Sequence, residues 1–129
     1  MSNQIHNHYD YDDIQKMYIQ KDVKIWKDEL SIIAEELSLA KEVFVEYIKN
    51  ARLSYDNILN SIHDFSQLNE NFQEDLSNYT SGLESLKECD DLQCETYFVN
   101  DHKDFKNRID QYFDKYRQFK RQVILKIRR

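Results

Sequence analysis

Residues 19–51 read IQKDVKIWKDELSIIAEELSLAKEVFVEYIKNA, and this stretch decides the fold. Its apolar residues recur at alternating spacings of four and three. They are Ile19, Val23, Trp26, Leu30, Ile33, Leu37, Ala40, Phe44, Tyr47 and Ala51. This alternation places all of them along one side of an α-helix, as in the seam of a coiled coil. The stretch therefore predicts a long helix whose apolar side packs against other helices.

Two further stretches carry the same alternation. The first comprises Ile58, Ile62, Phe65, Asn69, Phe72, Leu76, Tyr79, Leu83 and Leu86. The second comprises Phe98, His102, Phe105, Ile109, Tyr112, Tyr116, Phe119 and Val123. Between the stretches, at residues 50–57 and 89–95, the alternation stops and short polar residues that can cap a helix gather. We therefore expect helices at about residues 10–51, 55–88 and 95–127.

The three expected helices match in length, since each runs for roughly 50–60 Å at ~1.5 Å per residue. Short connections force neighbouring helices to run antiparallel. The expected fold is therefore all-α, with three long helices in an up-down-up antiparallel, coiled-coil-like bundle that forms a single domain over residues 1–129. Residues 1–9 are expected to be flexible. Residues 9–21 either extend the first helix beyond the bundle or form a short extra N-terminal helix.

Glycine and proline are nearly missing from the chain. One glycine and no proline occur in 129 residues, so the residues on which tight turns and strand-rich folds depend are lacking. Phosphate sites and oxyanion holes need glycines for close backbone approach, which excludes a P-loop, a dinucleotide fingerprint and a nucleophile elbow. The Glu-x-x-His pairs of di-metal bundles are also missing. We expect a protein that is not an enzyme and has no cofactor.

The apolar runs of the sequence are short. Even Val123-Ile124-Leu125 falls far below the ~20 residues that a membrane-spanning helix needs, so no membrane span is expected. The N-terminus MSNQIHNHYDYDD is polar and acidic, without the cationic start and apolar region of a secretory signal peptide. We therefore expect a cytoplasmic protein.

Two polar residues interrupt the apolar stretches. Asn69 resembles the buried polar residue that fixes register in coiled coils, but its neighbour Leu68 could take the core position instead. His102 must find a hydrogen-bond partner if it is buried, and a tyrosine, an Asn or water could serve. A histidine in this position could also make stability pH-dependent.

A metal site is an alternative interpretation of His102. Thiolate and imidazole suit tetrahedral zinc, so Cys89, Cys94 and His102 could bind a metal together with a fourth ligand. Their spacing is not that of a known zinc motif. In a reducing cytosol, the two cysteines are otherwise expected to be ordinary thiols beside a turn.

The C-terminal end of the last helix is basic, although the whole chain has a net charge of −6. From residue 115 onward it contains no acid and seven basic residues, namely Lys115, Arg117, Lys120, Arg121, Lys126, Arg128 and Arg129. One interpretation is solubility together with the favourable position of cations at a helix C-terminus. The other is contact with an anionic partner: an acidic protein, a second copy or a membrane surface. Nucleic acid is not expected, because the sequence pI is near 5.2.

Aromatic residues at helical spacing carry one resemblance. Trp26-x-x-x-Leu30, His102-x-x-Phe105 and Tyr112-Phe113-x-x-Tyr116-x-x-Phe119-Lys120 are similar to the pattern of a family of small, uncharacterised bacterial helical-bundle proteins. The resemblance covers most of residues 22–129 and implies a bundle without an activity. Together, these features favour a non-enzymatic interaction protein that binds a protein partner or itself, through its helix faces or its basic end. A metal-binding bundle is the alternative.

Overall fold

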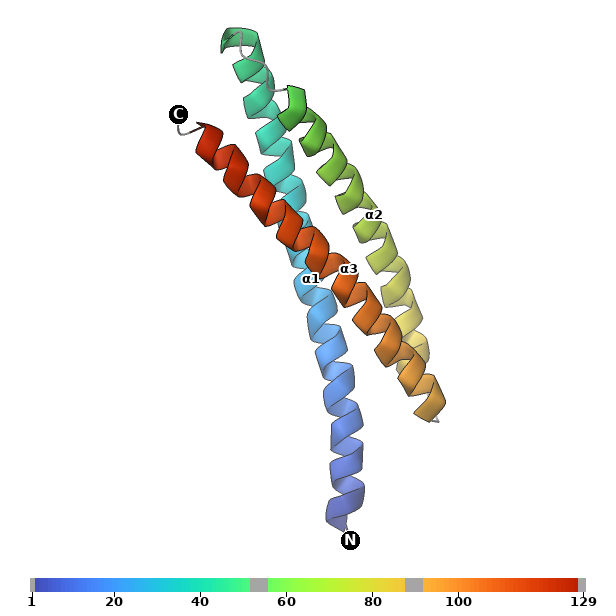
Figure 1. The fold of residues 1–129 in the computed structure, drawn as a ribbon. Coiled ribbons are helices and arrows are strands. Elements are labelled where there is room, and N and C mark those ends of the chain that lie inside the picture. The colour runs from blue at the N-terminus through green and yellow to red at the C-terminus, as the bar shows by residue number, and fades with distance from the viewer. Residues whose placement is uncertain (1, 52–55, 88–91, 128–129) are drawn as a thin grey trace.

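The computed structural model consists of three α-helices. They are α1 (Ser2–Ala51), α2 (Asp56–Lys87) and α3 (Leu92–Ile127), and no strand occurs in these ranges. The structure describes the backbone of these helices and the side chains of residues 15–46, 57–83 and 97–126. The chain runs up, down and up through the three helices (Figure 1). The prediction of an all-α bundle is therefore confirmed. None of the helices, over the residues described, has an apolar stretch that would span a bilayer.

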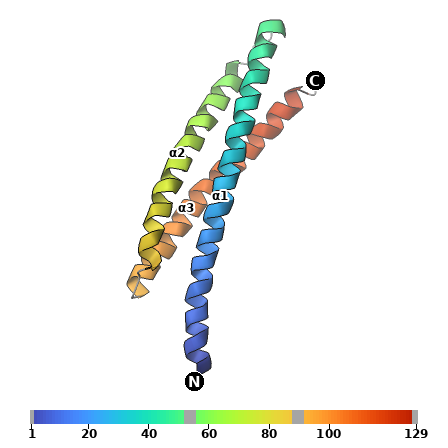
Figure 2. The same ribbon diagram turned by 180° about the vertical axis from the view of Figure 1, so that it is seen from behind.

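The N-terminal part of α1 extends beyond the ends of the other two helices (Figures 1 and 2). α1 is one uninterrupted helix that begins at Ser2, ahead of the predicted start near residue 10. Of the two arrangements expected for residues 9–21, the extended first helix is therefore correct. The separate short helix is wrong, because no proline or glycine interrupts the helix in this region.

The helices are not equally close to one another. The backbones of α1 and α2 approach each other most closely, whereas α3 crosses them obliquely. The C-terminal end of α3 lies on the far side of α1 from the beginning of α2, as both views show (Figures 1 and 2). The basic end of α3 therefore diverges from α2.

The core is formed by the three predicted seams. Among the described side chains, the buried apolar members of these seams are Ile19, Val23, Trp26, Leu30, Ile33, Leu37, Phe44, Ile58, Ile62, Phe72, Leu76, Phe105, Ile109, Tyr112, Tyr116 and Val123. Ala40, Phe65, Tyr79, Leu83 and Phe119 pack against this core and are partly buried. Tyr47, Ala51 and Leu86 lie outside the described side chains. The alternation of three and four thus identified the buried apolar residues among the described side chains, apart from Phe113.

Asn69, and not Leu68, occupies the core position on α2. Asn69 is 1% exposed and Leu68 is 45% exposed. The Asn69 side-chain amide donates a hydrogen bond of 3.1 Å to the backbone carbonyl of Leu30, and its Oδ1 accepts one of 2.7 Å from Gln73. These bonds offset the cost of burying the amide. The bond to Leu30 also fixes the register of α2 relative to α1, as a buried asparagine does in a coiled coil.

Candidate functional site

The predicted basic end of α3 is exposed where the structure describes it. Lys115, Arg117, Lys120, Arg121 and Lys126 are all exposed, and Arg128 and Arg129 lie outside the described residues. Two of these cations form ion pairs within the chain: Lys120 with Glu36 of α1, and Arg117 with Asp114 one turn earlier on α3. Arg121 and Lys126 form no ion pair with any other described residue. The basic end is therefore an open helix surface, except that Lys115 also lines a groove between α2 and α3.

Glu36 joins α1 to α3 through two side chains. The Tyr116 hydroxyl donates a hydrogen bond of 3.1 Å to Glu36 Oε1, and Lys120 donates one to Glu36 Oε2. Burial raises the pKa of Tyr116 above the ordinary tyrosine range, and the charge of Glu36 adds to this effect. The Tyr116 hydroxyl therefore stays protonated and keeps donating. This contact holds the middle of α3 against α1.

His102 connects all three helices. Its Nδ1 lies 2.6 Å from the Tyr79 hydroxyl of α2, and its Nε2 lies 2.9 Å from Asp22 Oδ2 of α1. Because an ionised carboxylate only accepts, Nε2–H donates to Asp22, and in the neutral imidazole Nδ1 then accepts from Tyr79. The Trp26 ring stacks on the imidazole, with the ring centroids 5.0 Å apart. Of the three partners considered for His102, namely a tyrosine, an Asn and water, the structure shows a tyrosine, and Asp22 is a further partner.

This cluster has the residue types of a hydroxyl–imidazole–carboxylate relay. A hydroxyl in such a relay is activated by a lowered pKa or by an adjacent base. Burial raises the pKa of Tyr79 well above its ordinary range, and the charges of Asp101 and Asp22 raise it further. The aromatic rings of Trp26 and Phe105 pack around the same cluster. The arrangement therefore keeps the Tyr79 hydroxyl protonated and joins the three helices.

The alternative metal site involves residues that the structure describes only in part. Cys89 and the side chain of Cys94 lie outside the described residues. Both ring nitrogens of His102 are already engaged, so a metal would have to displace the Tyr79 hydroxyl from Nδ1 or the Asp22 carboxylate from Nε2. Among the described side chains, no group of three His, Cys, Asp or Glu residues is arranged to hold a metal ion.

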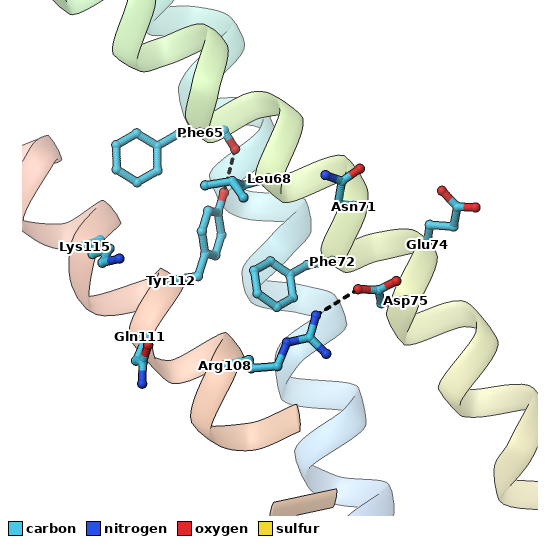
Figure 3. Close-up of a pocket in the computed structure, with 10 residues that line it drawn as sticks. All are labelled: Phe65, Leu68, Asn71, Phe72, Glu74, Asp75, Arg108, Gln111, Tyr112 and Lys115. Atoms are coloured by element: carbon cyan, nitrogen blue, oxygen red, sulfur yellow. Dashed lines mark hydrogen bonds and ion pairs between the residues drawn. The ribbon is translucent and has the colours of Figure 1, made fainter. Parts of the chain in front are cut away.

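A groove of about 570 Å³ lies between α2 and α3 (Figure 3). Its apolar surface comes from Phe65, Leu68, Phe72 and Tyr112. Arg108 reaches across it and donates a hydrogen bond of 3.1 Å to Asp75. The Arg108 guanidinium lies 5.6 Å from the ring centroids of both Phe72 and Phe105, within cation–π range. Because Arg108 covers part of the apolar surface, this groove is a weak candidate for binding an apolar partner.

α1 carries an apolar surface outside the core. Tyr18, Ile25, Ile32 and Leu39 follow one another at intervals of seven residues and are between 46% and 63% exposed. Seven residues are nearly two helical turns, so these side chains lie along one side of the helix. Val43, which is 42% exposed, lies one turn after Leu39 on the same side. We call these five residues the α1 stripe.

Acidic residues border the α1 stripe. On a helix, the surface neighbours of a residue lie three and four positions away. For Ile32 these neighbours are Asp28, Glu29, Glu35 and Glu36, so all four are acidic. Of them, only Glu36 pairs with a cation among the described residues. At the centre of the stripe, the apolar side chain of Ile32 is therefore surrounded by acidic residues.

Comparison with protein-family models, with curated proteins and with solved structures found no match. The resemblance to small bacterial helical-bundle proteins therefore stays a prediction. The candidate surfaces have to be judged from their own chemistry.

Sequence reasoning missed the α1 stripe, although the signal for it was available. Ile25, Ile32 and Leu39 each come directly before a residue of the core seam. Their interval of seven was therefore hidden by the stronger alternation of the seam itself. A separate search for apolar residues at intervals of seven would have found it. The structure adds that the three helices leave this second set uncovered.

Proposed function

We propose that this protein is a non-enzymatic interaction protein and that it binds a protein partner through the α1 stripe. The observation that supports this most directly is the regular exposure of Tyr18, Ile25, Ile32 and Leu39 along one side of a long helix. Apolar side chains that recur at intervals of seven along one side of a helix are the anchors with which a helix packs against a partner helix. A helix from a partner is the occupant that a stripe of this periodicity fits.

The energetics also favour a partner at this surface. Fully burying one large aliphatic side chain contributes about 1.5–3 kcal/mol relative to leaving it exposed. The stripe contains three such residues at intervals of seven, Ile25, Ile32 and Leu39, and they are between 46% and 62% exposed in the monomer. Covering them would therefore contribute roughly half of this free energy for each residue, less the cost of association. The groove between α2 and α3 offers less apolar surface to a partner, since Arg108 already covers part of it.

The experiment compares the binding of wild-type protein with that of a stripe variant, Ile25→Ser with Ile32→Ser. Tagged proteins are expressed in the source cells, and the partners that copurify are quantified by mass spectrometry. We expect at least one protein, which can be the untagged chain itself, to be retained by wild type and lost from the variant. The physical reason is that the substitutions place hydroxyls where apolar contact is required.

Leu68→Ser is the matched control. Leu68 has nearly the same exposed fraction as Ile25 and Ile32, but it belongs to α2 and lines the α2–α3 groove. This variant should retain the partner. If the stripe variant keeps every partner of wild type, the proposal is wrong. If Leu68→Ser alone loses the partner, the α2–α3 groove is the binding surface instead.

A further inference from the structure

The C-terminal end of α3, like the α1 stripe, has exposed aliphatic side chains beside charged residues, but here the charges are positive. Ile124 and Leu125 are 46% and 52% exposed. The helix neighbours of Ile124 on its N-terminal side are Lys120 and Arg121, and Lys126 follows Leu125. Lys120 is paired with Glu36, whereas Arg121 and Lys126 have no acidic partner among the described residues. We call Ile124, Leu125 and their basic neighbours the α3 end.

The two surfaces are complementary in both properties that decide helix pairing. Each presents exposed aliphatic side chains, which gain free energy when they cover one another. The border of the α1 stripe is acidic around Ile32, although Lys21 lies beside Tyr18 and Ile25, and the border of the α3 end is basic. Contact at the centre of the stripe therefore brings opposite charges together. They do not cover one another within a single chain, because both sets of side chains are exposed.

Pairing of like surfaces is unfavourable. Two α1 stripes in contact would place Asp28, Glu29 and Glu35 of one molecule near the same acids of the other. Two α3 ends would oppose Arg121 and Lys126 in the same way. Like charges across an interface are destabilising, so a two-fold symmetric contact through either surface is disfavoured. A contact between the two different surfaces avoids this repulsion.

We propose that the occupant of the α1 stripe is the α3 end of a second copy of this chain. This inference rests on the proposed function and names the partner. The contact is heterologous, because each molecule offers two different surfaces and uses one with each neighbour. A heterologous contact that does not close into a ring adds molecules without limit. The protein should therefore form chains whose average length grows with concentration.

The sharpest test uses two variants, each of which has one of the two surfaces altered and the other intact. Ile32→Glu adds a fifth charge to the acidic centre of the stripe and leaves the α3 end intact. Ile124→Glu places an acid among the cations of the α3 end and leaves the stripe intact. Both positions are exposed in the folded chain, so both variants should fold, which circular dichroism verifies. Sedimentation velocity over a concentration series then gives the assembly size of each protein.

The expected result is specific to a heterologous contact. Wild type should show species that grow with concentration, and each variant alone should self-associate ~10-fold or more weakly. A mixture of the two variants should form a dimer and stop there. In that dimer, the intact α3 end of Ile32→Glu binds the intact stripe of Ile124→Glu. No second contact is possible, since the two remaining surfaces are the altered ones.

Several outcomes would overturn this inference. Wild type that remains monomeric at high micromolar concentration excludes self-association through these surfaces. A mixture that remains monomeric excludes the heterologous arrangement, and so does either variant associating as strongly as wild type. These failures are separate from failure of the proposed function. A monomeric protein that still loses a cellular partner on Ile25→Ser with Ile32→Ser binds through the stripe, but to a different chain.

Discussion

The Tyr79 hydroxyl lies 2.6 Å from Nδ1 of His102, and this contact joins α2 to α3 at the level where His102 also binds Asp22 of α1. One imidazole therefore connects three helices through two hydrogen bonds. Both bonds are shielded by aromatic rings, since Trp26 and Phe105 pack against the cluster. A hydrogen bond in such a place is worth more than one on the surface, because loss of one partner leaves the other buried and unsatisfied.

Replacing Tyr79 by phenylalanine tests the energetic value of this contact. We expect Tyr79→Phe to lower the free energy of unfolding by about 1–3 kcal/mol, because Nδ1 of His102 loses its donor while it stays buried. Urea denaturation, followed by the fluorescence of the single tryptophan, Trp26, measures the change directly. Tyr97→Phe is the matched control, because Tyr97 is exposed and should change stability by less than about 0.5 kcal/mol. Equal losses in the two variants would show that the His102 contact contributes nothing.

The buried tyrosines should make the protein unstable in alkali. Burial raises the pKa of Tyr112 from 10.0 to about 12, while the nearby Asn69 side chain acts in the opposite direction. The Tyr112 hydroxyl donates a hydrogen bond of 2.9 Å to the backbone carbonyl of Phe65. A tyrosine with a raised pKa binds its proton more tightly in the folded state. Its contribution to stability is therefore complete below pH 10 and is lost as the pH rises to about 12. The pKa of Tyr79 and that of Tyr116 are raised by burial as well, so these residues act in the same direction.

Urea denaturation at a series of alkaline pH values measures this effect. The free energy of unfolding should fall between pH 10 and about 12, and it should fall less steeply in Tyr112→Phe, which cannot ionise at this position. Ultraviolet absorbance of the tyrosinates follows the ionisation separately. If wild type and Tyr112→Phe lose stability in parallel, then Tyr112 does not ionise on unfolding and the prediction is wrong.

Ile32 and Ile33 are neighbours in the sequence with opposite environments. Ile33 is buried in the core, whereas Ile32 belongs to the exposed α1 stripe. Ile33→Ala should lower the free energy of unfolding by about 2–5 kcal/mol, since it removes buried methyl groups and leaves a cavity. Ile32→Ala should change it by less than about 0.5 kcal/mol in the dilute protein. Chemical denaturation of both variants at low concentration measures the difference, and a large loss in Ile32→Ala would mean that the stripe supports the monomer.

The three seams could be predicted from the sequence because the buried residues of a helix follow its periodicity directly. The sequence predicted the side on which Ile33 lies, the C-terminal ends of the helices and the need of His102 for a partner, but not the start of α1 at Ser2. It could not choose between Asn69 and Leu68, which are adjacent and differ by only about 100° around the helix. That choice depends on where the neighbouring helices lie. In the structure, the carbonyl of Leu30 and the side chain of Gln73 are placed to satisfy an amide at position 69.

The partners of His102 could be predicted only in part, for a similar reason. Tyr79 lies in a predicted seam, so its contact with a seam histidine follows from an antiparallel arrangement. Asp22 precedes Val23 and lies beside the seam of α1, where a sequence gives no indication that α3 crosses. The oblique path of α3 brings His102 to Asp22 and, further along, Lys120 to Glu36. Crossing angles depend on the packing of many side chains and not on a single repeat.

Asn69→Leu tests whether this amide determines how the helices pair. Leucine at a core position contributes apolar burial, whereas asparagine in a coiled-coil seam costs stability and specifies register. We expect Asn69→Leu to raise the free energy of unfolding by about 1 kcal/mol and to reduce the uniqueness of helix pairing. The nuclear magnetic resonance spectrum of the backbone amides should then show broader or duplicated peaks. A variant that is less stable than wild type would mean that the Leu30 and Gln73 contacts outweigh the cost of burying the amide.

Salt should weaken the proposed head-to-tail association, because the α1 stripe and the α3 end combine apolar contact with opposite charge. Screening shortens the range of charge interactions from ~30 Å at 0.01 M salt to ~3 Å at 1 M. Sedimentation velocity should therefore show shorter assemblies as NaCl is raised, with the apolar part of the contact left at high salt.

Glu35→Lys reverses one acid that borders both Ile32 and Leu39, and it should weaken association at low salt but have little effect at high salt. Glu74→Lys is the control, since it makes the same charge change on α2, beside the α2–α3 groove and away from the α1 stripe. Equal effects of the two substitutions would mean that net charge, and not the border of the stripe, controls assembly.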